Sequence, residues 1–291
     1  MKKIIVILFL ILIVLTTCCS YKYLHRPFRE FSDSTDLIGK NTIYVFEQLQ
    51  EEEILLRIAE SIRKERLKPS DLEPKVITTE HLELRKLLIE YVVDYAELLE
   101  SVIIKEYNKD ITNNAKKVHD NLENISINHY EFLSKNEIGI MSSLAVALPE
   151  ALTAARNRRF ILKLMKQNDS LLEKTTAVLK EELESTKEMI NNFYSRQFLL
   201  TAAEPWPDTE SKREKYAKIG AKILDRRREI NVILADLIKA VDTIHPTHQR
   251  LMKFVKTNKG PLRTLASLVN YAARVEAMYL DFSEKKDSKK K

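Results

Sequence analysis

The longest stretch of the chain without a helix-breaking residue runs from Leu148 to Ala203, and it restricts the chain to helical folds. After Pro149 it contains neither glycine nor proline until Pro205. Within it, apolar and small residues recur at steps of four and three, the spacing that keeps one stripe on one helix face. At 1.5 Å per residue such a helix is ~80 Å long. We therefore expect an elongated protein whose other helices pack along this run. The stripe consists of Leu172, Thr176, Leu179, Leu183, Thr186, Ile190 and Phe193.

The composition favours long helices and excludes several kinds of site. Only four glycines and eight prolines occur among 291 residues, which is typical of helical rather than sheet proteins. The net charge of +6 is mild and the basic residues are interspersed with acids, so we expect no nucleic-acid partner. Cys18 and Cys19 are the only cysteines, which excludes a disulfide or a thiolate metal site in the rest of the chain.

Residues 1–20 have the organisation of a signal peptide. Lys2 and Lys3 precede an unbroken apolar run from Ile4 to Leu15. This run is too short to span a hydrocarbon core of ~30 Å comfortably, which favours a signal peptide over a permanent transmembrane helix. An ordinary secretory signal and an uncleaved anchor remain the alternatives to the interpretation that follows.

The next residues, Leu15-Thr16-Thr17-Cys18, resemble the lipobox of bacterial lipoproteins, although Thr17 stands where Gly, Ala or Ser is more common. The resemblance covers only this N-terminal region. It implies a signal peptide at 1–17, acylation of Cys18 (alternatively Cys19) with palmitate-type chains, and attachment to a membrane. No Asp follows either cysteine directly. By the sorting pattern of that class, this implies a cell outer membrane protein that faces the periplasm.

For the rest of the chain, the sequence predicts a tether followed by an all-α bundle. We expect a membrane-proximal tether at 18–34, whose aromatic and basic residues either rest on lipid headgroups or pack on the bundle. An elongated antiparallel helical bundle or coiled coil of about five long helices should occupy 35–283. Residues 284–291 form a lysine-rich tail that we expect to be disordered.

Individual helices follow from prolines, caps and periodicity. A first helix should end before Pro69, with Glu51, Glu52 and Glu53 forming a solvated acidic turn. Thr79 should cap a second helix that passes a register slip near residue 108 and continues to about 133. The expected helices are approximately 35–68, 79–133, 137–203 with a kink at Pro149, 209–258 and 262–282.

The prolines Pro205 and Pro207 predict a turn that folds the helices on either side into an antiparallel hairpin. If Ile190 faces Ile223, facing residues have index sums of 413, and Leu183 then faces Ile230. The same register places Arg227 opposite Thr186. A charged residue in an apolar seam can fix the register of the pair.

Two groups of residues are candidates for binding. Asp169, His245 and His248 come to one level of the predicted hairpin and form a weak candidate metal site. A kinked helix end with solvated histidines is the competing interpretation, and we predict no metal. Arg156, Arg159, Lys163 and Lys166 are spaced to form a basic face for phosphate headgroups or an acidic partner, or a solvated face paired with local acids.

No motif in the chain points to catalysis. Gly-rich phosphate loops, nucleophile elbows and Cys/His arrangements are missing from the sequence, so we expect neither an enzyme nor a cofactor. The sequence favours a lipid-anchored scaffold or interaction module of the cell envelope, bound to the membrane by its acyl chains and to an unknown envelope protein or to itself. The alternative is a membrane-active helical protein, of the curvature-binding (BAR-like) or pore type.

Overall fold

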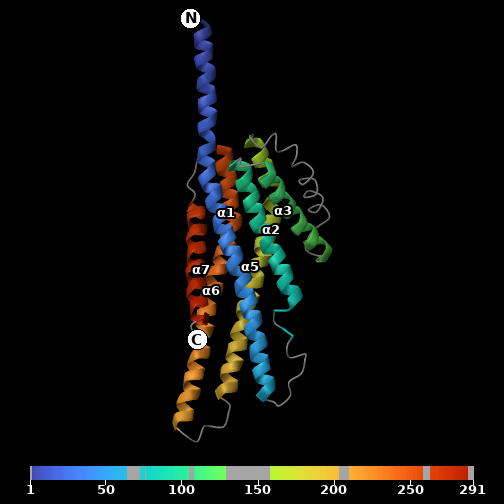
Figure 1. Cartoon of the computed structure of the whole chain (residues 1–291), viewed down its shortest axis with the longest axis vertical. Coiled ribbons are helices and arrows are strands. Elements are labelled where there is room, and N and C mark those ends of the chain that lie inside the picture. The colour runs from blue at the N-terminus through green and yellow to red at the C-terminus, as the bar shows by residue number, and fades with distance from the viewer. Residues whose placement is uncertain are drawn as a thin grey trace.

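The computed structural model confirms an all-α fold (Figure 1). It describes residues 2–63, 73–75, 77–104, 108–128, 158–202, 210–257 and 263–287, and side chains in the first helix from Tyr23 onward. Six helices lie in these ranges, one more than expected. They are α1 (Lys2–Arg63), α2 (Thr79–Ile104), α3 (Asn108–Asn128), α5 (Arg158–Ala202), α6 (Glu210–Thr257) and α7 (Arg263–Asp287).

The helices run side by side along one long axis (Figure 1). α5 and α6 form an antiparallel hairpin, as predicted, and α1 packs against α2, α6 and α7. We call the end that contains residues 23–36 of α1, the start of α5 and the end of α6 the N-proximal end. The distal end contains residues 50–63 of α1 and the turn of the α5–α6 hairpin. α1, α2 and α6 each pack against three other helices, and α5, the described part of the run from Leu148, packs mainly against α6 and also against α2.

The first helix is longer than the sequence predicted, because it begins at Lys2 rather than near residue 35. It continues through Pro27, and Leu24, Phe28 and Phe31 are buried in the common core. Burial of an aromatic ring removes a large apolar area from water, so these rings belong to the bundle rather than to a tether that rests on headgroups. The described part of the chain contains no helix apolar and long enough to cross a membrane.

The expected single helix over 79–133 is wrong, because two helices occupy this region. α2 ends at Ile104, α3 begins at Asn108, and α3 folds back along α2 (Figure 1). The polar interface between them joins Asn121 Nδ2 to Asp94 Oδ2 at 2.7 Å and Lys117 Nζ to Glu97 Oε2 at 3.3 Å. The reversal lets the apolar stripe of α3 face the core. Its buried residues are Ile111, Ala115, Val118, Leu122 and Ile125.

At the distal end, the acidic residues of α1 are structural rather than solvated. Glu53 is buried, and its carboxylate accepts hydrogen bonds from the backbone N–H groups of Lys75 (2.7 Å) and Ile77 (3.2 Å). Glu52 accepts hydrogen bonds from Tyr194 of α5 and Arg226 of α6. The predicted solvated turn is therefore wrong for both residues. Buried backbone donors require partners, and Glu53 provides them for the connection to α2.

Other boundaries differ in smaller ways. The described part of the long predicted run is α5, and Arg156, Pro149 and the segment 137–148 lie outside the described residues. α6 continues through Pro246 without interruption. α7 extends to Asp287, so residues 284–287 of the predicted disordered tail are helical, and 288–291 lie outside the described residues.

Candidate functional site

A chain of hydrogen-bonded polar side chains joins three helices near the N-proximal end. Asp169 on α5 accepts a hydrogen bond from His245 Nε2 and another from His248 Nδ1, both at 3.1 Å to its Oδ1 atom. The second ring nitrogen of His248, Nε2, lies 2.8 Å from the hydroxyl of Tyr95 on α2. Tyr95 also stacks on Tyr91, with ring centroids 6.2 Å apart. We call these four hydrogen-bonded residues the His–Asp network.

The contacts assign the protons of this network. An ionised carboxylate only accepts hydrogen bonds, so His248 carries its proton on Nδ1 and its Nε2 accepts one from Tyr95. Burial lowers the pKa of His248, although the hydrogen bond to Asp169 opposes this effect. The hydrogen bond from His248 lowers the pKa of Asp169. Burial also raises the pKa of Tyr95. Near neutral pH the network therefore holds a neutral imidazole between a carboxylate and a phenol.

The His–Asp network is suited to joining helices rather than to catalysis. His248 is 0% exposed, and both of its nitrogens are occupied. A group that handles protons in catalysis must reach the substrate within hydrogen-bond distance or through one water. Only Asp169 and His245 have partly exposed side chains. A fully satisfied buried polar network instead specifies which helix faces meet.

The sequence correctly predicted that Asp169, His245 and His248 come together, and in the structure hydrogen bonds join them. One carboxylate oxygen of Asp169 accepts a hydrogen bond from each histidine at 3.1 Å. The competing interpretation of solvated histidines is wrong for His248. Among the described residues, the side chains that could converge on a metal ion are His119, Asp120 and Glu123, on the accessible surface of α3.

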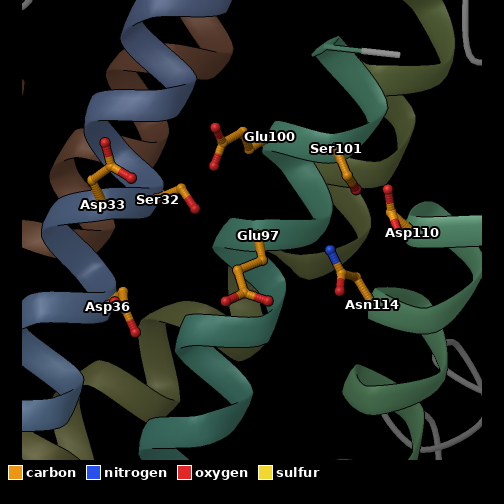
Figure 2. A pocket seen from close by; sticks show the side chains of 8 residues that line it. All are labelled: Ser32, Asp33, Asp36, Glu97, Glu100, Ser101, Asp110 and Asn114. Atoms are coloured by element: carbon orange, nitrogen blue, oxygen red, sulfur yellow. The ribbon is translucent and has the colours of Figure 1, made fainter. Parts of the chain in front are cut away.

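A second candidate site is an acidic pocket between α1, α2 and α3 (Figure 2). Its volume is about 310 Å³, and carboxylates from all three helices line it. The sequence did not predict it, since the site forms only because α3 turns back on α2. The lining residues are Ser32, Asp33, Asp36, Glu97, Glu100, Ser101, Asp110 and Asn114.

Burial of carboxylates along α2 disfavours their ionised forms. Burial raises the pKa of Asp94, one turn from the acidic pocket, to about 6, although Lys117 opposes the rise. Burial likewise raises the pKa of Glu100, and a hydrogen bond from Ser32 opposes it. Such a site has the charge to attract cations, although Lys40 already pairs with Asp36 at 2.5 Å and Lys117 with Glu97 at 3.3 Å.

The helices α5 and α6 pair antiparallel as predicted, but the side chain of Arg227 does not contact Thr186, the residue predicted to face it. At the N-proximal end, Arg158 Nε donates to the carbonyl of Val255, a pair with the predicted index sum of 413. Arg227, however, contacts Asn191 Oδ1 and Ser195 Oγ, each at 3.0 Å, rather than Thr186. Its long side chain runs along the groove towards polar partners. The hydroxyl of Thr186 is buried without a hydrogen-bond partner among the described residues.

The remaining predicted site residues are only partly described. Arg159, Lys163 and Lys166 are exposed on the first turns of α5, as a basic face requires, and Arg156 lies outside the described residues. Cys18 and Cys19 lie on the backbone of α1, and their side chains are outside the described residues.

Comparisons with known proteins give no relative from which a site could be transferred. No family model, no curated protein and no solved structure matches this chain.

Proposed function

We propose that the protein is a lipid-anchored helical scaffold or interaction module of the cell envelope. The continuity of α1 is the observation that supports this proposal most directly. One helix contains both the lipobox-like segment and the central strut of the bundle. Five residues separate Cys18 from Leu24, the first buried core residue of α1. Acylation at Cys18 would therefore hold the bundle directly beside the membrane.

Such an anchor would make the bundle a rigid strut. From Leu24 to Arg63, α1 rises ~60 Å at 1.5 Å per residue. The distal end would stand at that distance from the bilayer if the axis were upright. The long side faces of α3, α5 and α6 would then be available to partner proteins or to a second copy, because extended helix faces suit helix-in-groove contacts.

Mass spectrometry of the mature protein from envelopes tests the anchor. We expect an acylated N-terminal cysteine, loss of the lipid and of membrane retention in Cys18→Ser, and retention of both in the matched control Cys19→Ser. If only Cys19→Ser loses the lipid, the acylated residue is Cys19 instead of Cys18. A protein with both cysteines unmodified and free in solution would contradict the proposal.

The scaffold role has its own test. Cross-linking in intact envelopes should join exposed side faces of the bundle to the same partner, or to a second copy, in the wild type and in Cys19→Ser. The cross-links should be lost in the unanchored Cys18→Ser variant. Cross-links that persist without the anchor would show that position at the membrane does not determine partnership.

The membrane-active alternative predicts a different distribution of charge. Proteins that bind curved membranes along their length need basic residues along one side face. Here the exposed basic residues of α1, α5 and α6 that stand in segments without acids lie close to one end, whereas the distal Lys218 and Arg228 of α6 pair with Glu214 and Asp225. This favours a bundle that stands on the membrane over one that lies along it.

A further inference from the structure

Exposed basic residues of three helices gather at the N-proximal end. They include Arg26 and Arg29 on α1, Lys163 and Lys166 on α5, and Lys253 and Lys256 on α6. No acidic residue occurs in the corresponding segments 21–29, 158–168 and 249–257. We call these six residues the basic end. The sequence predicts its α5 part and, within the tether at 18–34, its α1 part, but not that both lie beside the end of α6, which is far away in the chain.

Contacts between helices show that the three segments are level with one another. The hydrogen bond from Arg158 to the carbonyl of Val255 joins the start of α5 to the end of α6. The ion pair between Arg226 and Glu52 sets the antiparallel register of α6 and α1. Moving 29 residues from this pair along each helix, towards the N-proximal end, reaches Val255 on α6 and Tyr23 on α1. With an equal rise per residue, these positions lie at the same height.

The direction of α1 indicates that the basic end lies next to the membrane. Its N-terminal part, which contains the proposed anchor residue Cys18, projects beyond the bundle from this same end (Figure 1). Tyr23, at the base of the projection, is 74% exposed. Aromatic rings and basic side chains are the residues enriched where proteins meet headgroups. We propose that the basic end docks on the anionic lipid headgroups of the membrane that holds α1.

The local ion pairs of the basic end leave it accessible to phosphate. Arg26 and Arg29 pair with Glu30 at 2.7 Å and Asp33 at 3.8 Å, one turn further along α1. Both arginines remain largely exposed in these pairs, which contribute little in water. Guanidinium groups form bidentate contacts with phosphate oxygens, so lipid headgroups can replace or share these partners.

The acidic pocket gives the docked bundle a direction. Its carboxylates from Asp36, Glu97 and Asp110 lie between α1, α2 and α3 (Figure 2), whereas four of the six basic-end residues belong to α5 and α6. An anionic surface attracts the basic α5–α6 side and repels the side with the acidic pocket. The bundle therefore leans towards the membrane on its α5–α6 side. This orientation rests on the proposed membrane location of α1 but does not require acylation.

Lysine labelling of the full chain in vesicles tests the docking. The protein is reconstituted in vesicles of phosphatidylcholine alone or with phosphatidylglycerol, and a water-soluble amine reagent is applied. We expect Lys163, Lys166, Lys253 and Lys256 to be labelled severalfold more slowly with phosphatidylglycerol at about 0.1 M salt, and the difference to shrink at high salt. The distal Lys215, Lys218 and Lys222 should react equally in both vesicles. The proposal would be overturned if phosphatidylglycerol slowed labelling equally at the two ends. It would also be overturned if the four basic-end lysines were labelled at the same rate in both kinds of vesicle.

Charge removal provides the second measurement. Replacing the four basic-end lysines of α5 and α6 by Gln should reduce the preference for phosphatidylglycerol over phosphatidylcholine vesicles by about tenfold or more, since each lysine near an anionic surface contributes on the order of fivefold. The matched control replaces Lys215, Lys218, Lys222 and Arg228 by Gln and should leave the preference unchanged. Unmodified cysteines with an intact lipid preference would contradict the acyl anchor alone. Acylated protein without lipid preference would contradict the docking alone.

Discussion

The two ends of this bundle are held together by different chemistry. At the N-proximal end, α1, α2, α5, α6 and α7 surround a core of fully buried rings, among them Phe28, Phe31, Tyr91 and Tyr95. At the distal end, the interface of α5 and α6 combines buried apolar residues such as Ile190 and Ile230 with a polar cluster of Asn191, Asn231 and Arg227. A helix of uniform composition can thus be rigid at one end and loosely held at the other, according to how many neighbours cover it.

The largest expected difference between the ends concerns a buried ring. Phe31→Ala removes a fully buried side chain of α1 and should lower the free energy of unfolding by about 3–5 kcal/mol. Phe198→Ala is the matched distal change, on a ring that is only partly buried. It should lower the free energy of unfolding by less than half as much, because less area is exposed to water on truncation. Denaturant unfolding measures both, and equal losses would remove the proposed contrast.

Two helical glycines sharpen the comparison, because alanine should have opposite effects at them. A Cβ atom at Gly39 would lie 2.6 Å from Val93 Cγ2 and 3.1 Å from Ile89 Cγ2, so α1 and α2 would have to separate. We expect Gly39→Ala to lower the free energy of unfolding by roughly 1–2 kcal/mol despite the gain in helix propensity.

The matched variant is Gly220→Ala in the distal part of α6. Its Cβ atom would meet the edge of the Phe198 ring at 3.2 Å, and this partly exposed ring can move aside. The gain in helix propensity, up to ~1 kcal/mol, should then dominate and stabilise the protein. Thermal unfolding of the two variants checks the signs. A loss of stability in Gly220→Ala would indicate that the distal end is packed as rigidly as the other.

Features determined by residues within one helix can be predicted from the sequence, whereas features that depend on contacts between distant segments cannot. The stripe of α5 is predicted correctly as far as Ile190, because a period of 3.6 residues can be recognised within one helix alone. The reversal between Ile104 and Asn108 was missed, since no glycine or proline marks it. The expectation of a solvated Glu53 fails because its partners are backbone N–H groups 22 and 24 residues further along the chain.

The candidate sites follow the same division. Asp169, His245 and His248 could be brought together from sequence, because one hairpin with one turn determines their level. Tyr95 was missed, because the position of α2 relative to that hairpin depends on tertiary packing. The acidic pocket and the basic end each combine three helices, and periodicity within a helix contains no information about which faces of different helices meet.

The His–Asp network should make the N-proximal end sensitive to pH. Burial lowers the pKa of His248, so its neutral form stabilises the fold. The stabilisation is complete above pH 6.5, the unfolded value, and is lost as pH falls from there towards the folded pKa, because the unfolded chain takes up the proton first. One proton limits the slope to ~1.4 kcal/mol per pH unit. His248→Gln should flatten this slope below pH 6.5 in denaturant unfolding.

Asp94 provides a control of opposite sign for that titration. Its pKa is raised to about 6, so the protonated carboxyl stabilises the fold. This contribution is complete below its unfolded pKa of 3.8 and is lost as pH rises through about 6. Asp94→Asn should therefore steepen the loss of stability on acidification, where His248→Gln reduces it. Identical pH profiles for the wild type and both variants would contradict the two pKa shifts.

The smallest expected effect lies in the distal seam. Arg227→Met removes the contacts to Asn191 and Ser195 and should cost about 0.5–1.5 kcal/mol. The matched control is Arg228→Met, whose side chain is exposed and pairs with Asp225 at 3.6 Å, and it should change little. Because few helices cover this region, the cost should appear as faster amide hydrogen exchange confined to residues 186–202 and 210–231, by about two- to tenfold. Acceleration that spreads to α2 would mean that both ends unfold as one unit, and the contrast between them would then be one of composition without a difference in dynamics.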